Sequence, residues 1–175
     1  MALSEILQMS NSKRKIGVSK ERLMAIMPEL RNYIAFWRKY PDLFVDFLIT
    51  GGNPVQTDEN GGKYYIDASG EKKRVKFSLY SYQRIFLRVG MRYKYVYCVY
   101  PRAYSKSFLS VLIMILKCIL YPGAHLFSAA GGKEQSSQIL QEKTQDIISK
   151  IPSIKNEIKW DRGSGTLEGK DHCRY

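Results

Sequence analysis

Cysteine and histidine are scarce in this chain, which has three cysteines and two histidines among 175 residues. The cysteines (Cys98, Cys118 and Cys173) are far apart, and no CxxC pair or Cys/His cluster is present. Structural zinc sites and disulfide frameworks need such spacings, so neither is expected. Cys98 and Cys118 lie in apolar runs and are predicted to be small core residues.

Long apolar runs are also missing. Met1 to Lys20 contains no apolar stretch, so no signal peptide is expected there. Phe108 to Tyr121 is nearly all apolar but is shorter than the ~20 residues that cross a bilayer, and Pro122-Gly123 ends it. We therefore predict a buried core helix, no membrane partner, and a protein of the reducing cytoplasm.

Acidic residues are few relative to basic ones. The chain has 16 Asp and Glu against 28 Lys and Arg, a formal charge of +12. This balance favours an anionic partner such as nucleic acid, although a basic protein of a membrane surface would share it. Hydrophobic residues make up 45% of the chain, which is enough for a sizeable core.

Shifts in composition along the chain predict five parts. Residues 1–19 form a basic arm, 20–50 a helical lead-in broken at Pro28 and Pro41, and 51–77 a Gly-rich hairpin or linker. Residues 78–160 form the core, and 161–175 an irregular, charge-rich tail. The hairpin is expected around the β-like run Lys63 to Ile66.

Helical and strand-like patterns alternate within the core. Helices are predicted at Leu79–Val89, Lys106–Leu120 and Lys133–Ile151, and strands at Tyr93–Tyr100, His125–Ala130 and within Ile154–Trp160. Strand–helix–strand order predicts an α/β fold, with a parallel sheet covered by flanking helices and preceded by a helical N-terminal segment.

The segment Tyr100-Pro101-Arg102-Ala103-Tyr104-Ser105-Lys106-Ser107 joins a predicted strand to an apolar helix. This layout is typical of a phosphate-binding loop, where backbone N–H groups cradle phosphate, a Lys reaches the β/γ-phosphates and a hydroxyl holds Mg²⁺. Both glycines of G-x-x-x-x-G-K-[ST] are replaced, by Tyr100 and Ser105. The alternative is an ordinary β–α turn in which Ser105 or Ser107 caps the helix.

Two further features accompany the loop. Gln83 lies upstream on a predicted helix, and its amide could read adenine while Tyr80 or Tyr82 stacks on the base. Arg102 lies inside the loop, where a guanidinium could stabilise charge on the γ-phosphate. Each feature alone is also compatible with an ordinary surface side chain.

Together, Tyr82-Gln83, the aliphatic strand and Arg-x-x-Ser-Lys-Ser resemble the N-terminal ATPase portion of the large terminase subunit of tailed bacteriophages. The resemblance covers roughly Tyr40 to Trp160, and it departs from the family at Ser105, where glycine is usual. It implies an incomplete P-loop ATPase of the ASCE or RecA-like kind. It implies ATP and Mg²⁺ as cofactors, with Lys106 and Arg102 as catalytic residues and Ser107 on Mg²⁺. The ATP-binding residues would be Tyr82, Gln83, Arg102, Ala103, Tyr104, Ser105, Lys106 and Ser107.

The resemblance also implies a biological setting. The family packages double-stranded viral DNA into the procapsid as a homo-oligomeric motor in the infected bacterial cytoplasm, together with a portal protein and a small terminase subunit. Its Walker B Asp-Glu pair and its nuclease carboxylates are not found in the sequence. The chain is therefore expected to be the first part of such an ATPase domain and inactive alone.

Two other functions remain open at this point. A helicase-like, nucleic-acid-dependent ATPase fragment shares the Gln and loop motifs. A non-enzymatic, basic DNA-binding module would use the positive charge and the 13 tyrosines. An open sheet edge would in either ATPase case predict association of the isolated chain.

Overall fold

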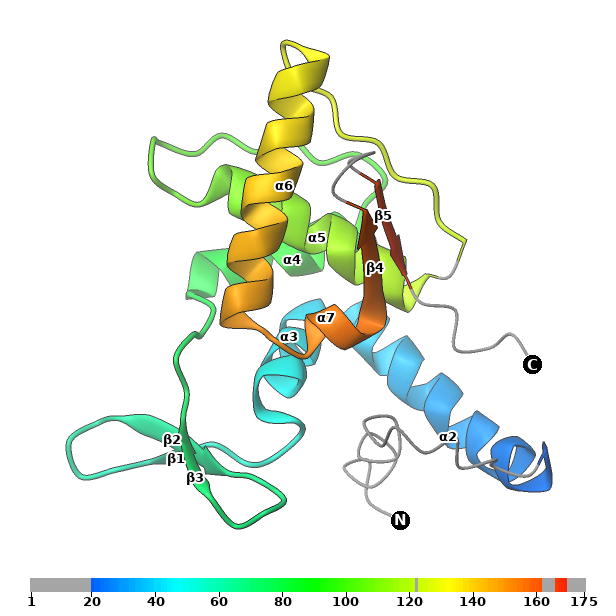
Figure 1. The fold of residues 1–175 in the computed structure, drawn as a ribbon, viewed down its shortest axis with the longest axis vertical. Helices are drawn as coiled ribbons and strands as arrows, with labels where there is room; N and C mark the ends of the chain where they lie inside the picture. Colours follow the sequence, from blue (N-terminus) through cyan, green and yellow to red (C-terminus); the bar gives the residue numbers. More distant parts are fainter. Residues whose placement is uncertain (1–19, 122, 162–165, 170–175) are drawn as a thin grey trace. The chain divides into compact units, whose positions relative to one another are not determined.

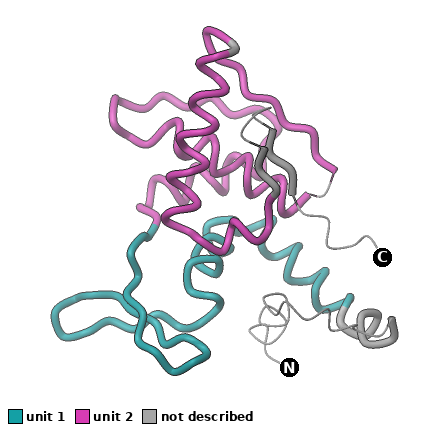
Figure 2. Tube along the Cα trace, viewed as in Figure 1, with its two compact units in different colours: residues 1–78 teal, residues 79–175 magenta. Residues whose placement is uncertain are grey.

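The computed structural model describes residues 20–121, 123–161 and 166–169. The described residues form a mixed α/β protein, with six helices and two small antiparallel sheets. The chain divides into two compact units, Met1–Ser78 and Leu79–Tyr175 (Figure 2). The mixed α/β class predicted from the sequence is confirmed, whereas the parallel sheet is not among the elements of the described residues.

The first unit contains two consecutive helices, α2 (Lys20–Lys39) and α3 (Pro41–Thr50). Tyr40 separates them with φ −126° and ψ 68°, and Pro41 occupies the first turn of α3, where its missing N–H leaves no hydrogen bond unmade. Trp37 of α2 packs on two phenylalanine rings of α3, at centroid distances of 4.8 and 4.9 Å. The predicted helical lead-in and its break before Pro41 are thus confirmed, whereas the break predicted at Pro28 is wrong, because α2 runs through Pro28 without interruption.

A three-stranded antiparallel sheet follows in the same unit. Its strands are β1 (Gln56–Thr57), β2 (Lys63–Ile66) and β3 (Lys72–Arg74), in the order β1-β2-β3. The hairpin predicted around Lys63 to Ile66, the strand β2, is confirmed. In the register of β2 and β3, Tyr64 lies opposite Arg74 and Ile66 opposite Lys72.

Both turns of this sheet use the same chemistry. Each begins with an aspartate whose backbone carbonyl accepts a hydrogen bond from a glycine N–H at 3.0 Å. Gly61 donates to Asp58, and Gly70 donates to Asp67. The two glycines have φ values of 76° and 82°, which side chains other than glycine rarely adopt. The pattern Asp-x-x-Gly thus forms three-residue hairpin loops with a left-handed last residue.

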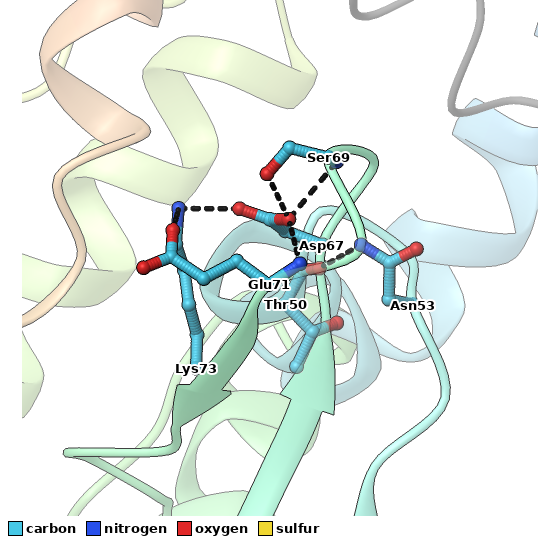
Figure 3. Close-up of polar contacts among 6 residues, drawn as sticks. All are labelled: Thr50, Asn53, Asp67, Ser69, Glu71 and Lys73. Carbon is cyan, nitrogen blue, oxygen red and sulfur yellow. Dashed lines mark hydrogen bonds and ion pairs between the residues drawn. The ribbon is translucent and has the colours of Figure 1, made fainter.

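The Asp67 carboxylate accepts several polar contacts from the β2–β3 turn and from β3 (Figure 3). It accepts the N–H groups of Ser69 and Glu71 at 2.9 and 3.0 Å, the Ser69 hydroxyl, and an ion pair from Lys73 Nζ at 2.5 Å. The Lys73 ammonium, with these hydrogen bonds, holds the pKa of Asp67 well below its usual range. Asn53 meanwhile donates to the Thr50 carbonyl at 2.9 Å beyond the end of α3.

The second unit is mainly helical (Figure 1). Its elements are α4 (Ser81–Arg92), α5 (Lys106–Leu120), α6 (Lys133–Lys150), α7 (Ile154–Glu157), β4 (Ile158–Asp161) and β5 (Thr166–Gly169). The bounds predicted for α5 are confirmed at both ends. β5 lies in the segment predicted to be irregular, and it pairs antiparallel with β4.

Helix α5 is the centre of this unit and contacts α4, α6, β4 and β5. Its buried side chains lie within roughly one half of the helix circumference: Phe108, Leu109, Val111, Leu112, Ile115, Leu116 and Leu120. A Cβ on Gly90 of α4 would come within 2.3 Å of the Ile113 side chain, so glycine lets these two helices approach closely. The prediction of a buried core helix is confirmed.

Two predicted strands are not formed among the described residues. Residues 93–100 and 125–130 are extended or irregular, and neither pairs with a strand of the two sheets. Tyr95, Tyr97 and Phe127 are 84%, 92% and 93% exposed. The physical reason is that a strand, unlike a helix, needs a neighbouring strand to take up its backbone groups. Similarly, the first half of the strand predicted in Ile154–Trp160 is instead helix α7.

Two other expectations concern single features. Cys98 is exposed, so its assignment to the core was wrong, because residues 93–100 lack the sheet that would have covered it; Cys118 is partly buried. No helix among the described residues is long and apolar enough to cross a membrane.

Candidate functional site

The loop that carries the predicted site connects residues 93–100 to α5. Helix α5 begins at Lys106, directly after Ser105, so Lys106 and Ser107 occupy its first turn. The N–H groups of a first helical turn have no acceptor within the helix, and the helix dipole is positive at this end. The sequence-predicted pair Lys106-Ser107 is therefore placed where an anion would be stabilised.

The backbone of the loop has an unusual shape for its sequence. Ala103 and Ser105 have φ values of 66° and 53°, and they are the non-glycine residues with positive φ among the described residues. An L-residue in this region costs roughly 1–2 kcal/mol. Left-handed residues alternating with right-handed ones turn successive N–H groups to one side, which forms an anion-binding concavity. The loop thus adopts glycine-like conformations without containing glycine.

Lys106 folds back over this loop. Its Nζ donates a hydrogen bond to the Tyr100 carbonyl at 2.9 Å, while the residue as a whole stays exposed. The ammonium thereby closes the loop between its first residue and the start of α5. An ammonium on a flexible side chain with a single neutral acceptor can exchange that acceptor for a stronger, anionic one.

An aromatic cluster joins the loop to α4. The Tyr82 ring lies 5.2 Å from Tyr104 and 6.2 Å from Tyr100, and the Phe86 ring lies 6.4 Å from Tyr100. Tyr80 stacks on Tyr82 at 6.0 Å. Burial, with smaller contributions from Cys98 and Tyr82, raises the pKa of the Tyr100 phenol. The structure therefore brings Tyr82 to the loop through ring packing with Tyr100 and Tyr104, which spacing alone did not reveal.

Gln83 lies in the first turn of α4 and is buried, with 3% of its surface exposed. Its Oε1 accepts the Tyr80 N–H at 2.9 Å, and its Nε2 lies 3.4 Å from the Tyr82 hydroxyl. The amide is thus used to cap α4. Reading adenine, the role predicted for Gln83, requires these two contacts to be exchanged for contacts with the base.

The remaining predicted residues are accessible. Arg102 and Ser107 are exposed, and Tyr104 is 46% exposed. Ser105 stands at the N-cap of α5, but its side chain makes no capping hydrogen bond. The alternative in which Ser105 is an ordinary helix cap therefore lacks the hydrogen bond that defines such a cap.

Among the described residues, no group of three or more His, Cys, Asp or Glu side chains is arranged to hold a metal ion. Lys150 Nζ of α6 lies 5.1 Å from the centre of the Phe108 ring in the first turn of α5, and the same ammonium is paired with Asp146 of α6.

Comparison with known proteins returned no match: no family model fits the chain, and neither a curated protein nor a solved structure resembles it significantly.

Proposed function

We propose that the loop Tyr100–Ser107 binds the phosphates of ATP, and that the chain represents the N-terminal part of the ATPase domain of a phage terminase large subunit. The observation that carries the proposal is the left-handed backbone at Ala103 and Ser105 beside Lys106. Strained non-glycine residues are retained where a function needs the conformation. A turn that served only to connect two elements would not require them.

Each loop residue has a chemical role in this proposal. Lys106 exchanges the Tyr100 carbonyl for the β/γ-phosphates, and the N–H groups around Ala103 to Ser107 hold the phosphate oxygens. Arg102, which is exposed, is free to approach the γ-phosphate. The Ser107 hydroxyl follows Lys106 at the exposed start of α5, so it fits a Mg²⁺ ligand, and the ion would offset phosphate charge when bound.

The wider setting is part of the same proposal. The substrate would be double-stranded DNA moved into a procapsid, in the cytoplasm of an infected bacterium. A portal protein, a small terminase subunit and further copies of the chain would be partners. The parallel sheet of a P-loop ATPase would be built from residues 93–100 and 125–130 with additional strands, which is consistent with the exposed apolar side chains at Tyr97 and Phe127.

The test is nucleotide binding by the full chain, measured by calorimetry with ATP and Mg²⁺. Loss of a charge-assisted hydrogen bond costs about 1.5–3 kcal/mol, so Lys106→Ala should weaken binding roughly 10- to 100-fold. Lys117→Ala, at the other end of α5, removes the same charge away from the loop and should leave affinity unchanged. Equal affinity of the wild type and Lys106→Ala would refute the site.

ATP hydrolysis is expected to differ from ATP binding. We expect little phosphate release from ATP by this chain, because the sequence offers no acidic pair to position water and Mg²⁺ after the loop. Efficient hydrolysis that disappears in Lys106→Ala would contradict this expectation and would place the missing acid elsewhere in the chain.

A further inference from the structure

The sheet β1-β2-β3 separates its charges by position. Every acidic residue between Gly51 and Ser78 lies in one of the two turns: Asp58, Glu59, Asp67 and Glu71. The basic residues lie on the strands or directly after β3. The strands therefore carry unmixed positive charge, and the turns carry the negative charge.

One face of this sheet collects the basic residues that lack a carboxylate. Cross-strand pairing puts Tyr64 with Arg74 and Ile66 with Lys72 on the same face. Lys76 continues the alternation of β3, since the Val75 N–H still donates to the Lys63 carbonyl at 2.9 Å. Lys72, Arg74 and Lys76 are all exposed. We call these three residues the basic row.

A lysine on the opposite face pairs with the acids of the β2–β3 turn. Lys73, which alternates with the basic row, pairs with Asp67 at 2.5 Å and lies 4.0 Å from Glu71 (Figure 3). No ion pair to Lys72, Arg74 or Lys76 is formed by the described residues. Asp67 is thus paired with Lys73, and the cations of the basic row are left without an ion pair of their own in the described part of the chain.

Lys72 is also held in place. Its Nζ lies 3.8 Å from the centre of the Tyr64 ring on the same face, a cation–π contact that fixes the ammonium without neutralising it. Lysine on an edge strand commonly serves to prevent sheet-to-sheet association, and β3 is such an edge. Preventing sheet-to-sheet association requires only one lysine on β3. It does not explain why the acidic residues lie only in the turns, or why three cations share one face.

We propose that the basic row of β3 binds the phosphodiester backbone of nucleic acid, without regard to sequence. The spacing favours this ligand, because alternate residues of a strand recur about every 6.7 Å and thus form a linear array of cations. A linear polyanion matches such an array, and the formal charge of +12 supports the association. This inference does not depend on the loop Tyr100–Ser107, which lies in the other unit.

The test measures fluorescence anisotropy of labelled oligonucleotides, single-stranded and duplex, at several salt concentrations. A triple variant, Lys72→Gln with Arg74→Gln and Lys76→Gln, removes the basic row. Its control, Lys117→Gln with Lys143→Gln and Lys155→Gln, removes the same charge from the second unit. Each neutralised phosphate contributes about 0.9 to the slope of log K against log salt for duplex and about 0.7 for single strands.

The basic-row variant should bind at least about 10-fold more weakly than the control, and its salt slope should fall by about 2–3 for duplex. Equal weakening of both variants would mean that only total charge matters and would overturn the proposal. Should the triple variant fail to fold, Arg74→Gln alone must lower the duplex slope by about 1, and an unchanged slope would overturn it.

Two further measurements separate the proposal from its rivals. Vesicles of phosphatidylserine and phosphatidylcholine test an anionic membrane, and binding to vesicles without binding to oligonucleotides would overturn the proposal. If Lys106→Ala lost nucleotide affinity while the basic-row variant kept full nucleic-acid affinity, the proposed function would stand and this inference would fail.

Discussion

Replacing Ser105 by glycine tests whether the loop really holds a left-handed residue. Elsewhere such a change usually destabilises a protein, because glycine has more conformational freedom to lose on folding, a cost of roughly 0.5–1 kcal/mol. At Ser105 the φ of 53° reverses the expectation. Glycine adopts this conformation without the roughly 1–2 kcal/mol that a side chain costs. The serine side chain makes no capping hydrogen bond that glycine would lose.

The two effects give a net gain for Ser105→Gly of about 0–1.5 kcal/mol in the free energy of unfolding. Ser107→Gly is the matched control, because it is the same substitution in the first turn of the helix α5, in right-handed backbone. It should lose about 0.5–1 kcal/mol. The entropy of the unfolded chain is common to both variants, so their difference isolates the cost of the left-handed serine.

Urea unfolding followed by circular dichroism measures this difference. With a slope of about 2 kcal/mol per molar urea, a difference of about 1–2 kcal/mol moves the midpoint by about 0.5–1 M between the two variants. Ala103→Gly should also shift toward higher stability, because Ala103 has a φ of 66°. If Ser105→Gly were as destabilising as Ser107→Gly, the left-handed backbone and the phosphate loop built on it would be refuted.

Three other outcomes follow from single features. Thr144 of α6 is fully buried, and its hydroxyl has no hydrogen-bond partner among the described residues. Thr144→Val should therefore raise the free energy of unfolding by about 1 kcal/mol, while Thr144→Ser lowers it. If urea unfolding showed that Thr144→Val is less stable than the wild type, the hydroxyl would have to be hydrogen-bonded. The lowered pKa of Asp67 contributes stability that is present at neutral pH and declines as the pH falls below its unfolded value of 3.8, toward its lower folded value. The gap in melting temperature between the wild type and Asp67→Asn should therefore narrow below about pH 4, and a constant gap would argue against the ion pair with Lys73. Finally, Tyr97 is 92% exposed in an extended segment that pairs with no strand among the described residues, so the isolated chain should self-associate. Tyr97→Lys should reduce the associated fraction measured by light scattering. A monodisperse wild-type monomer would contradict this prediction.

Much of the local structure could be predicted because it depends on neighbours in the sequence. The helix α5 was predicted from its apolar run, the break before α3 from Pro41, and the hairpin from the glycine-rich composition of residues 51–77 around Lys63 to Ile66. Helices and tight turns satisfy their own hydrogen bonds, so nearby residues are sufficient to specify them.

The strands predicted at 93–100 and 125–130 could not be decided from the sequence pattern alone. Their alternating aromatic and aliphatic residues are typical of strands, but a strand exists only beside another strand, and the described residues supply none. The exposure of Cys98 has the same origin. The helix α7 was missed because short elements are decided by their surroundings and have little pattern of their own.

For the candidate site, the sequence determined the order of Gln83, Arg102, Lys106 and Ser107 and the position of the last two at the start of a helix. Only the tertiary structure decided how these residues are used. In the structure, Ser105 has a left-handed backbone and the Lys106 ammonium donates to the Tyr100 carbonyl. Gln83 is buried and caps the start of α4. These outcomes depend on packing between segments that are distant in sequence, such as the rings of Tyr82 and Tyr104, and packing is a property that spacing along a chain does not specify.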